Sequence, residues 1–259
     1  MCIRDSTSAG ATNALLIAAN SANSSNLEKF WSQENLRTIM TQNLVDKTSF
    51  LQLRPKYSND GKQKVFQKFF GTKTMGEVLK PVFVTAYDVE LRKPILLKSY
   101  EHPETLIVEA ANATSAAPIY FPTASMRNNS WLIDGGIAAN NPALLAYVEA
   151  KKLFKGEQIK VFAIGTGLNR RKIDGKRSKD WGAIGWLKND ILGIMVESSL
   201  QHEVLKDLIN DDYLRINSPL NKVNRRMDDY SDKNIEKIKT LGEFWWADNK
   251  DLIKDFFNK

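Results

Sequence analysis

The chain has 259 residues, of which 42% are hydrophobic and 26% charged, which is enough apolar material for the core of one large α/β domain. Its single cysteine, Cys2, excludes an internal disulfide. The two histidines, His102 and His202, lie far apart with no cysteine pair, so neither a structural zinc site nor a histidine-rich catalytic metal site is expected. The longest apolar runs are strand-sized, well short of the roughly 20 residues of a membrane-spanning helix.

The formal net charge is +7, and one cluster of basic residues stands out after an apolar run. Its members are Arg170, Arg171, Lys172, Lys176, Arg177 and Lys179. Such a cluster is typical of a solvated surface loop, and it also suits peripheral contact with an anionic membrane surface. No aromatic interleaving or known binding motif accompanies it, so we do not expect nucleic acid as a partner.

Apolar runs bounded by turn residues alternate with segments of helical period, which predicts an α/β fold with a largely parallel sheet. Helices are expected over residues 9–22, 26–40, 60–70, 105–113, 143–154, 184–209 and 232–257. Strands are expected over residues 81–87, 94–100, 131–133, 159–164 and 213–216. No internal repeat or low-complexity linker interrupts the pattern, so we predict a single domain over residues 1–259.

Asp134 is the residue that most indicates chemistry. It ends an expected strand and is followed at once by Gly135 and Gly136. Active sites of α/β proteins gather where strands of a parallel sheet end, and glycine makes the tight turn there with least strain. Alone, an Asp-Gly-Gly sequence is an ordinary structural turn.

The surrounding segments change that interpretation, because together they resemble the patatin-like phospholipase family along almost the whole chain. The most specific of them are Ala113–Pro122 (ATSAAPIYFP) and Trp131–Leu144 (WLIDGGIAANNPAL). Weaker matches are Val82–Asp88 (VFVTAYD), Ile164–Gly167 (IGTG) and Met227–Ser231 (MDDYS) with Asn234 and Ile235. The resemblance implies a three-layer α/β/α fold with a mostly parallel central sheet.

The resemblance also implies a pair of catalytic residues without a histidine, in which Asp134 accepts the proton of a serine. Neither His102 nor His202 lies in a sequence that suits a general base, and this agrees with that arrangement. The reaction then needs only protein groups, so no cofactor or catalytic metal is expected.

Ser8 is the expected nucleophile, because Ser6–Gly10 (STSAG) stands where the resemblance places a Gly-x-Ser-x-Gly elbow ahead of a helix. Small flanking residues such as Ala9 and Gly10 let the serine occupy a strained strand-to-helix turn, with the Ala9 N–H directed at the developing oxyanion. Taken alone, the same residues are typical of a helix cap or a chain end. Ser115 is a rival nucleophile, but it lacks an elbow.

The start of the chain departs from the family. Ser6 replaces the first glycine of the elbow, and neither a first strand nor a glycine-rich oxyanion loop precedes it. We therefore expect an N-terminally truncated sequence in which residues 1–6 are not native. Because losing one oxyanion donor typically lowers turnover by about 10²–10³-fold, we expect this chain to be weakly active.

The leading hypothesis is a serine lipid acyl hydrolase that cleaves fatty acyl esters through an acyl-enzyme, in lipid catabolism. The alternative is a non-catalytic lipid-binding or scaffold protein with a degenerate patatin fold. A lipid or acyl-ester substrate is expected in either case. The sequence does not indicate the oligomeric state or the compartment; no signal peptide is visible, and a cytoplasmic or peripheral-membrane location is favoured.

Overall fold

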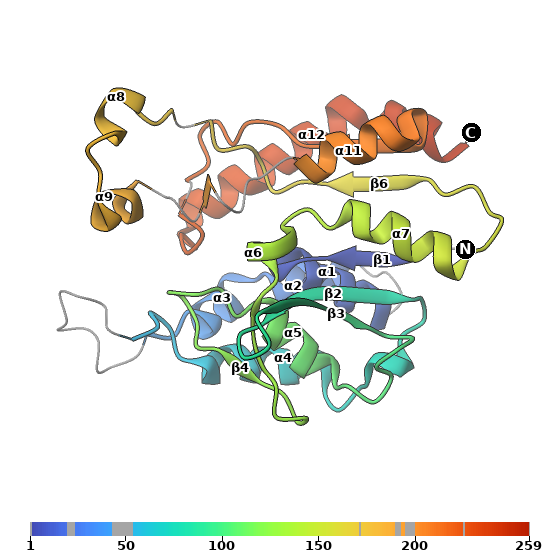
Figure 1. The fold of residues 1–259 in the computed structure, drawn as a ribbon, viewed down its shortest axis with the longest axis horizontal. Helices are drawn as coiled ribbons and strands as arrows, with labels where there is room; N and C mark the ends of the chain where they lie inside the picture. Colours follow the sequence, from blue (N-terminus) through green and yellow to red (C-terminus); the bar gives the residue numbers. More distant parts are fainter. Residues whose placement is uncertain are drawn as a thin grey trace. The chain divides into compact units, whose positions relative to one another are not determined.

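The structure, a computed structural model, describes residues 2–19, 24–42, 54–170, 172–189, 193–194, 200–224 and 226–258. The chain divides into two compact units, Met1–Lys155 and Gly156–Lys259, and each is described by itself (Figure 1). The expectation of one domain over residues 1–259 stays a prediction.

The first unit is built on a sheet of five strands with the order β1-β2-β5-β4, in which β3 also pairs with β2. The strands are β1 (Arg4–Ser6), β2 (Val82–Asp88), β3 (Lys93–Lys98), β4 (Ala124–Ser125) and β5 (Trp131–Asp134). Strand β2 is the centre of the sheet because it pairs with three neighbours. Its residues are buried almost throughout, as a central strand requires.

The expected α/β class is confirmed, but two details of the expected sheet are wrong. The sheet is mixed: β1 runs parallel to β2, whereas β3 and β5 run antiparallel to β2, and β4 antiparallel to β5. A tight turn reverses the chain after β2, where the Asp88 carboxylate accepts hydrogen bonds from the Glu90 and Leu91 amides and Arg92 is left-handed (φ 52°). Such short connections join antiparallel strands, whereas parallel pairs need long crossovers.

The second correction concerns the chain start, where residues 4–6 form strand β1 although the sequence led us to expect no first strand. Arg4, Asp5 and Ser6 are not typical strand residues, so the sequence pattern does not predict a strand here. They adopt the strand conformation because they pair in register with Val82–Val84 of the central strand. Tertiary pairing thus overrides local propensity here.

Eight helical segments accompany this sheet among the described residues. They are α1 (Ser8–Ala19), α2 (Ser24–Phe30), α3 (Gln33–Ile39), α4 (Asn59–Phe70), η2 (Met75–Glu77), α5 (Ile107–Thr114), α6 (Gly136–Ala139) and α7 (Ala143–Leu153). The single helix expected over residues 26–40 is instead two, because Ser32 begins α3 by accepting a hydrogen bond from the Asn35 amide. Residues 20–22 of the expected first helix lie outside the described residues.

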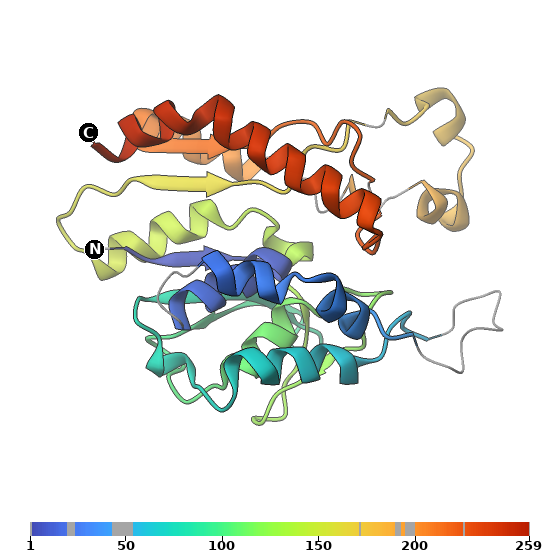
Figure 2. The same ribbon diagram turned by 180° about the vertical axis from the view of Figure 1, so that it is seen from behind.

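Helix α1 occupies the middle of the core and lies against β1, β2 and α5 (Figure 2). It is apolar on nearly all sides, as a fully surrounded helix should be. Leu15 and Leu16 are buried with Phe30 and Phe66 in one continuous hydrophobic cluster. This packing fixes the helix, and with it the position of Ser8 at its first residue.

The second unit contains two parallel strands, β6 (Val161–Ile164) and β7 (Tyr213–Ile216). Its described helices are α8 (Gly175–Ser178), α9 (Ala183–Lys188), α11 (Leu200–Ile209), η3 (Asn210–Asp212) and α12 (Asp232–Asn258). The helix expected over residues 184–209 includes residues 190–192 and 195–199, which lie outside the described residues. None of the helices in the described part of the chain is long and apolar enough to cross a membrane.

Candidate active site

The strand register of the first unit brings Ser8 and Asp134 to the same level of the sheet. Strand β1 runs parallel to β2 with Ser6 opposite Val84, so the chain reaches Ser8 two residues further along β2. On the same edge of β2, since β3 pairs along the other edge over Phe83–Asp88, β5 runs in the opposite direction and ends with Asp134 opposite Ala86. Ser8 and Asp134 therefore come together where β1 and β5 meet beside the central strand, although they lie 126 positions apart in the sequence.

Ser8 has the backbone geometry of a strained elbow. Its φ is +56°, in the left-handed region that residues other than glycine rarely adopt, and it starts helix α1 directly after β1. The Ser8 amide donates a hydrogen bond of 3.0 Å to Thr114 Oγ1. At Gly10, a Cβ atom would overlap the Ser6 hydroxyl, so a larger residue here would require that hydroxyl to move.

The Asp134 side chain is buried, with 6% of its surface exposed, and it lies beside the elbow. It accepts a hydrogen bond of 2.8 Å from the Gly136 amide, and the neighbouring Ser8 hydroxyl lowers its pKa. Burial raises the pKa of Asp134 to about 6, against the opposing effects of the Ser8 hydroxyl, the Gly136 hydrogen bond and the charge of Lys62. A carboxylate of that pKa is a far better proton acceptor at neutral pH than a solvated one.

A pair of threonines ties the elbow to the turn that follows Asp134. The buried Thr7 hydroxyl donates to the Ala139 carbonyl of α6 at 2.6 Å. Since its single proton is used there, the contact of 2.6 Å between Thr7 Oγ1 and Thr85 Oγ1 has Thr85 as the donor. Gly135 crosses directly over Thr85, so closely that a Cβ atom would overlap it.

The first turn of α1 can bind a negatively charged oxygen. The amides of a helix's first residues have no partner within the helix, and the helix dipole adds positive potential at that end. Ala9, the second residue of α1, is exposed. Its N–H is therefore suited to the oxyanion role expected from the sequence.

The alternatives to this pair are engaged elsewhere. The Ser115 hydroxyl donates to the Ala111 carbonyl at 2.6 Å, which is the back-bonding of an ordinary helical serine. His102 Nδ1 accepts the Lys98 amide within a turn, and His202 Nδ1 is bonded to the Tyr213 hydroxyl at 3.0 Å.

Sequence reasoning missed four side chains that surround Ser8 and Asp134. They are Thr7, Lys62, Thr85 and Thr114. The sequence does not indicate that the three threonines belong to the site, because each lies in a segment where any buried residue would fit the pattern equally well. Lys62 does carry a signal: it shares a helical face with Val65, Phe66 and Phe69, so a charge falls in an apolar stripe.

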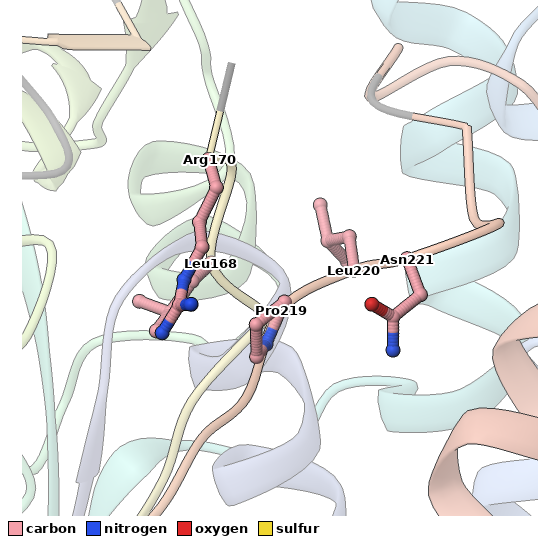
Figure 3. A pocket seen from close by; sticks show the side chains of 5 residues that line it. All are labelled: Leu168, Arg170, Pro219, Leu220 and Asn221. Carbon is pink, nitrogen blue, oxygen red and sulfur yellow. The ribbon is translucent and has the colours of Figure 1, made fainter. Parts of the chain in front are cut away.

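A pocket in the second unit is a poor candidate for catalysis. Its lining residues are Leu168, Arg170, Pro219, Leu220 and Asn221, whose side chains Figure 3 shows around an open space. They include neither a nucleophile nor a general base. No group of three or more potential metal ligands occurs among the residues that the structure describes.

Comparison with known proteins covers the part of the chain that contains Ser8 and Asp134. The family model of patatin-like phospholipase matches residues 6–147, which is more than half of the chain and contains both residues. Patatin-like protein 1 of Arabidopsis thaliana is 29% identical over 240 residues, covering 77% of this chain and 58% of its own. The cGAMP-activated phospholipase of Pseudomonas aeruginosa is 29% identical over 222 residues, covering 81% and 66%.

The chain thus spans less than two thirds of the length of these relatives. A solved structure, VipD from Legionella pneumophila, is 13% identical and covers 92% of this chain and 61% of its own, with a TM-score of 0.39. A score this low does not establish a common fold. The family model and the sequence relatives do establish the lineage: this chain belongs to the patatin-like phospholipase family.

Proposed function

We propose that this protein hydrolyses fatty acyl esters of lipids, with Ser8 as nucleophile and Asp134 as proton acceptor. The observation that carries the proposal is the position of Ser8, held in a left-handed turn at a helix start, beside the buried Asp134 carboxylate, whose pKa it lowers. Membership of a phospholipase family supports a lipid as the substrate.

The proposed reaction has two halves that use the same groups. Ser8 Oγ attacks the ester carbonyl carbon as Asp134 takes its proton, and the Ala9 N–H binds the resulting oxyanion. Collapse of this intermediate expels the alcohol, which takes the proton from Asp134 and leaves an acyl-enzyme. Water then attacks the acyl group, giving its proton to Asp134, and the fatty acid leaves as Ser8 regains that proton.

Removing either member of the pair should abolish turnover. We expect Ser8→Ala and Asp134→Asn each to lower kcat/KM for a medium-chain ester by at least about 10³-fold, because neither residue can act without the other. The measurement is release of fatty acid from an ester and from phospholipid vesicles by the purified protein. Ser125→Ala, an exposed serine on β4, is the matched control and should retain activity.

Three results would contradict the assignment. Activity that survives both substitutions would exclude the pair. Activity that is lost in Ser115→Ala but kept in Ser8→Ala would identify Ser115 as the nucleophile. A folded wild-type chain that binds lipid vesicles without releasing fatty acid would favour the non-catalytic alternative.

The pH dependence follows from the state of Asp134. The base must be ionised to accept the serine proton, and its pKa is raised to about 6, so activity should fall as the pH drops through that value. We expect the acid limb of kcat/KM near pH 6 when an ester that does not itself ionise is assayed. A folded enzyme with a plateau continuing below about pH 5 would show that a carboxylate of ordinary pKa acts instead.

Peripheral contact with an anionic membrane surface is a second part of the proposal, carried by residues 170–189 of the second unit. The described basic residues Arg170, Lys172, Lys176, Arg177 and Lys179 are all exposed. Close to them in sequence, Trp181 and Trp186 form an edge-to-face pair with centroids 5.3 Å apart, and Ile184 is 70% exposed. Basic residues beside an exposed isoleucine and two half-buried tryptophans match anionic headgroups above a hydrocarbon interior.

Vesicle binding tests this contact. Lys176→Glu/Lys179→Glu should weaken binding to vesicles containing phosphatidylserine by at least about tenfold, since each basic residue near such a surface contributes about 1 kcal/mol. Lys233→Glu/Lys250→Glu, exposed on α12, makes the same change of net charge and should have a smaller effect. Equal loss in the two variants, or binding that ignores both salt and anionic lipid, would refute the contact.

A further inference from the structure

Lys62, in the second turn of α4, is a buried charge that the proposed reaction leaves without a role. Its side chain has 1% of its surface exposed, and it is among the largest fully buried side chains of the described residues. A buried lysine is costly unless its ammonium group is hydrogen-bonded and faces a counter-charge. Its surroundings therefore show what that charge is for.

The ammonium group of Lys62 caps the C-terminal end of α5. Nζ donates to the carbonyls of Asn112 and Ser115, at 3.4 and 3.1 Å, and lies 4.3 Å from the centre of the Phe121 ring. The carbonyls at a helix C-terminus carry partial negative charge and lack partners within the helix, so a cation is favourable there. Lys62 thus fastens residues 112–115 to α4.

The segment that Lys62 fastens is the one that holds both members of the proposed catalytic pair. Thr114 Oγ1 accepts the Ser8 amide at 3.0 Å, and the Ala116 carbonyl accepts the Asp134 amide at 3.1 Å. Each of these two residues lies within one position of Ser115. A displacement of this segment would therefore move the nucleophile and its base together.

The positive charge of Lys62 also lowers the pKa of Asp134. Asp134 is faced by the Ser8 hydroxyl from α1, by the Gly136 amide from α6 and by Lys62 from α4. In turn, the charged group that acts on Lys62 is Asp134, beside the α5 carbonyls and the Phe121 ring. Each of the two buried groups thus favours the charged form of the other.

We propose that Lys62 is a positioning residue of the hydrolase site, fastening the end of α5 against Ser8 and Asp134 and supplying the positive charge opposite the Asp134 carboxylate. This inference rests on the proposed function, since it concerns how that site is held and charged.

The direction of the electrostatic effect follows from the two ionisations. Burial lowers the pKa of Lys62 to about 7, with Asp134 opposing this shift, so Lys62 is still largely charged at the pH where Asp134 titrates. Its charge holds the pKa of Asp134 below the value that burial alone would give. Removing the charge should therefore raise the pKa of Asp134 and move the acid limb of the rate profile to higher pH.

The test compares three variants of Lys62 with one control. In Lys62→Met and Lys62→Gln, the acid limb of kcat/KM should move up by at least about half a pH unit, so the loss of activity is larger at pH 6 than at pH 8. Lys62→Gln keeps an amide donor for the α5 carbonyls, and Lys62→Arg keeps the charge and should leave the limb in place. Lys64→Met, exposed on the same helix, should leave both limb and rate unchanged.

A second measurement needs no substitution. In the wild-type chain labelled with ¹³C-lysine, one side-chain resonance should titrate near neutral pH, well below the reference lysine pKa of about 10.4. The acid limb of kcat/KM could stay in place in folded Lys62→Met and Lys62→Gln, with the same loss of activity at all pH values. That result would show that Lys62 only caps α5 and does not act on Asp134. If the shifted lysine loses its proton below the pH of the acid limb, Lys62 is neutral where Asp134 titrates and the proposed charge balance is wrong. If instead the proposed function is wrong, Ser8→Ala will release fatty acid at the same rate as the wild-type chain.

Discussion

The burial of one carboxylate, that of Asp134, is the constraint on which the rest of the site depends. A buried carboxylate must find hydrogen bonds and positive charge to remain ionised, and here it finds the Ser8 hydroxyl, the Gly136 amide and Lys62. Each comes from a different helix, α1, α6 or α4, so the site forms only when these helices assemble on the sheet. Burial raises the pKa of Asp134 by more than these partners lower it. The pKa therefore stays above its ordinary value, and the same carboxylate is suited to take a proton.

The position of Ser8 carries a cost that the surrounding structure offsets. A left-handed conformation at a residue other than glycine is unfavourable by about 1–2 kcal/mol. Three features hold it: the buried helix α1 behind it, the Thr114 hydroxyl on its amide, and the Thr7 hydroxyl on the Ala139 carbonyl. The strain and its supports lie at the residue that the proposed reaction uses, as is common where a fold positions a nucleophile.

The sequence predicted the elements whose local pattern is strong and missed those that depend on tertiary contacts. Strand β7 was predicted at its observed bounds, and α4 and α12 to within one residue, because their periodicity or β-branched content is clear. Strand β1 and the antiparallel directions were missed, since pairing with β2 decides them. Ser8 and Asp134 were predicted from their motifs, and the fold brings them together. Thr114 acts through the amide of another segment, which no single-sequence pattern reveals, and Lys62 was missed although its charge falls in the apolar face of α4.

The central claim is that Ser8, activated by Asp134, is the nucleophile, and covalent labelling tests it most directly. A fluorophosphonate reacts only with an activated serine, and peptide mass spectrometry then locates the adduct. We predict one adduct per chain on the peptide containing Ser8, and strongly slowed labelling of Asp134→Asn. An adduct on Ser115 or another serine, or rapid labelling of Ser8 without Asp134, would contradict the account.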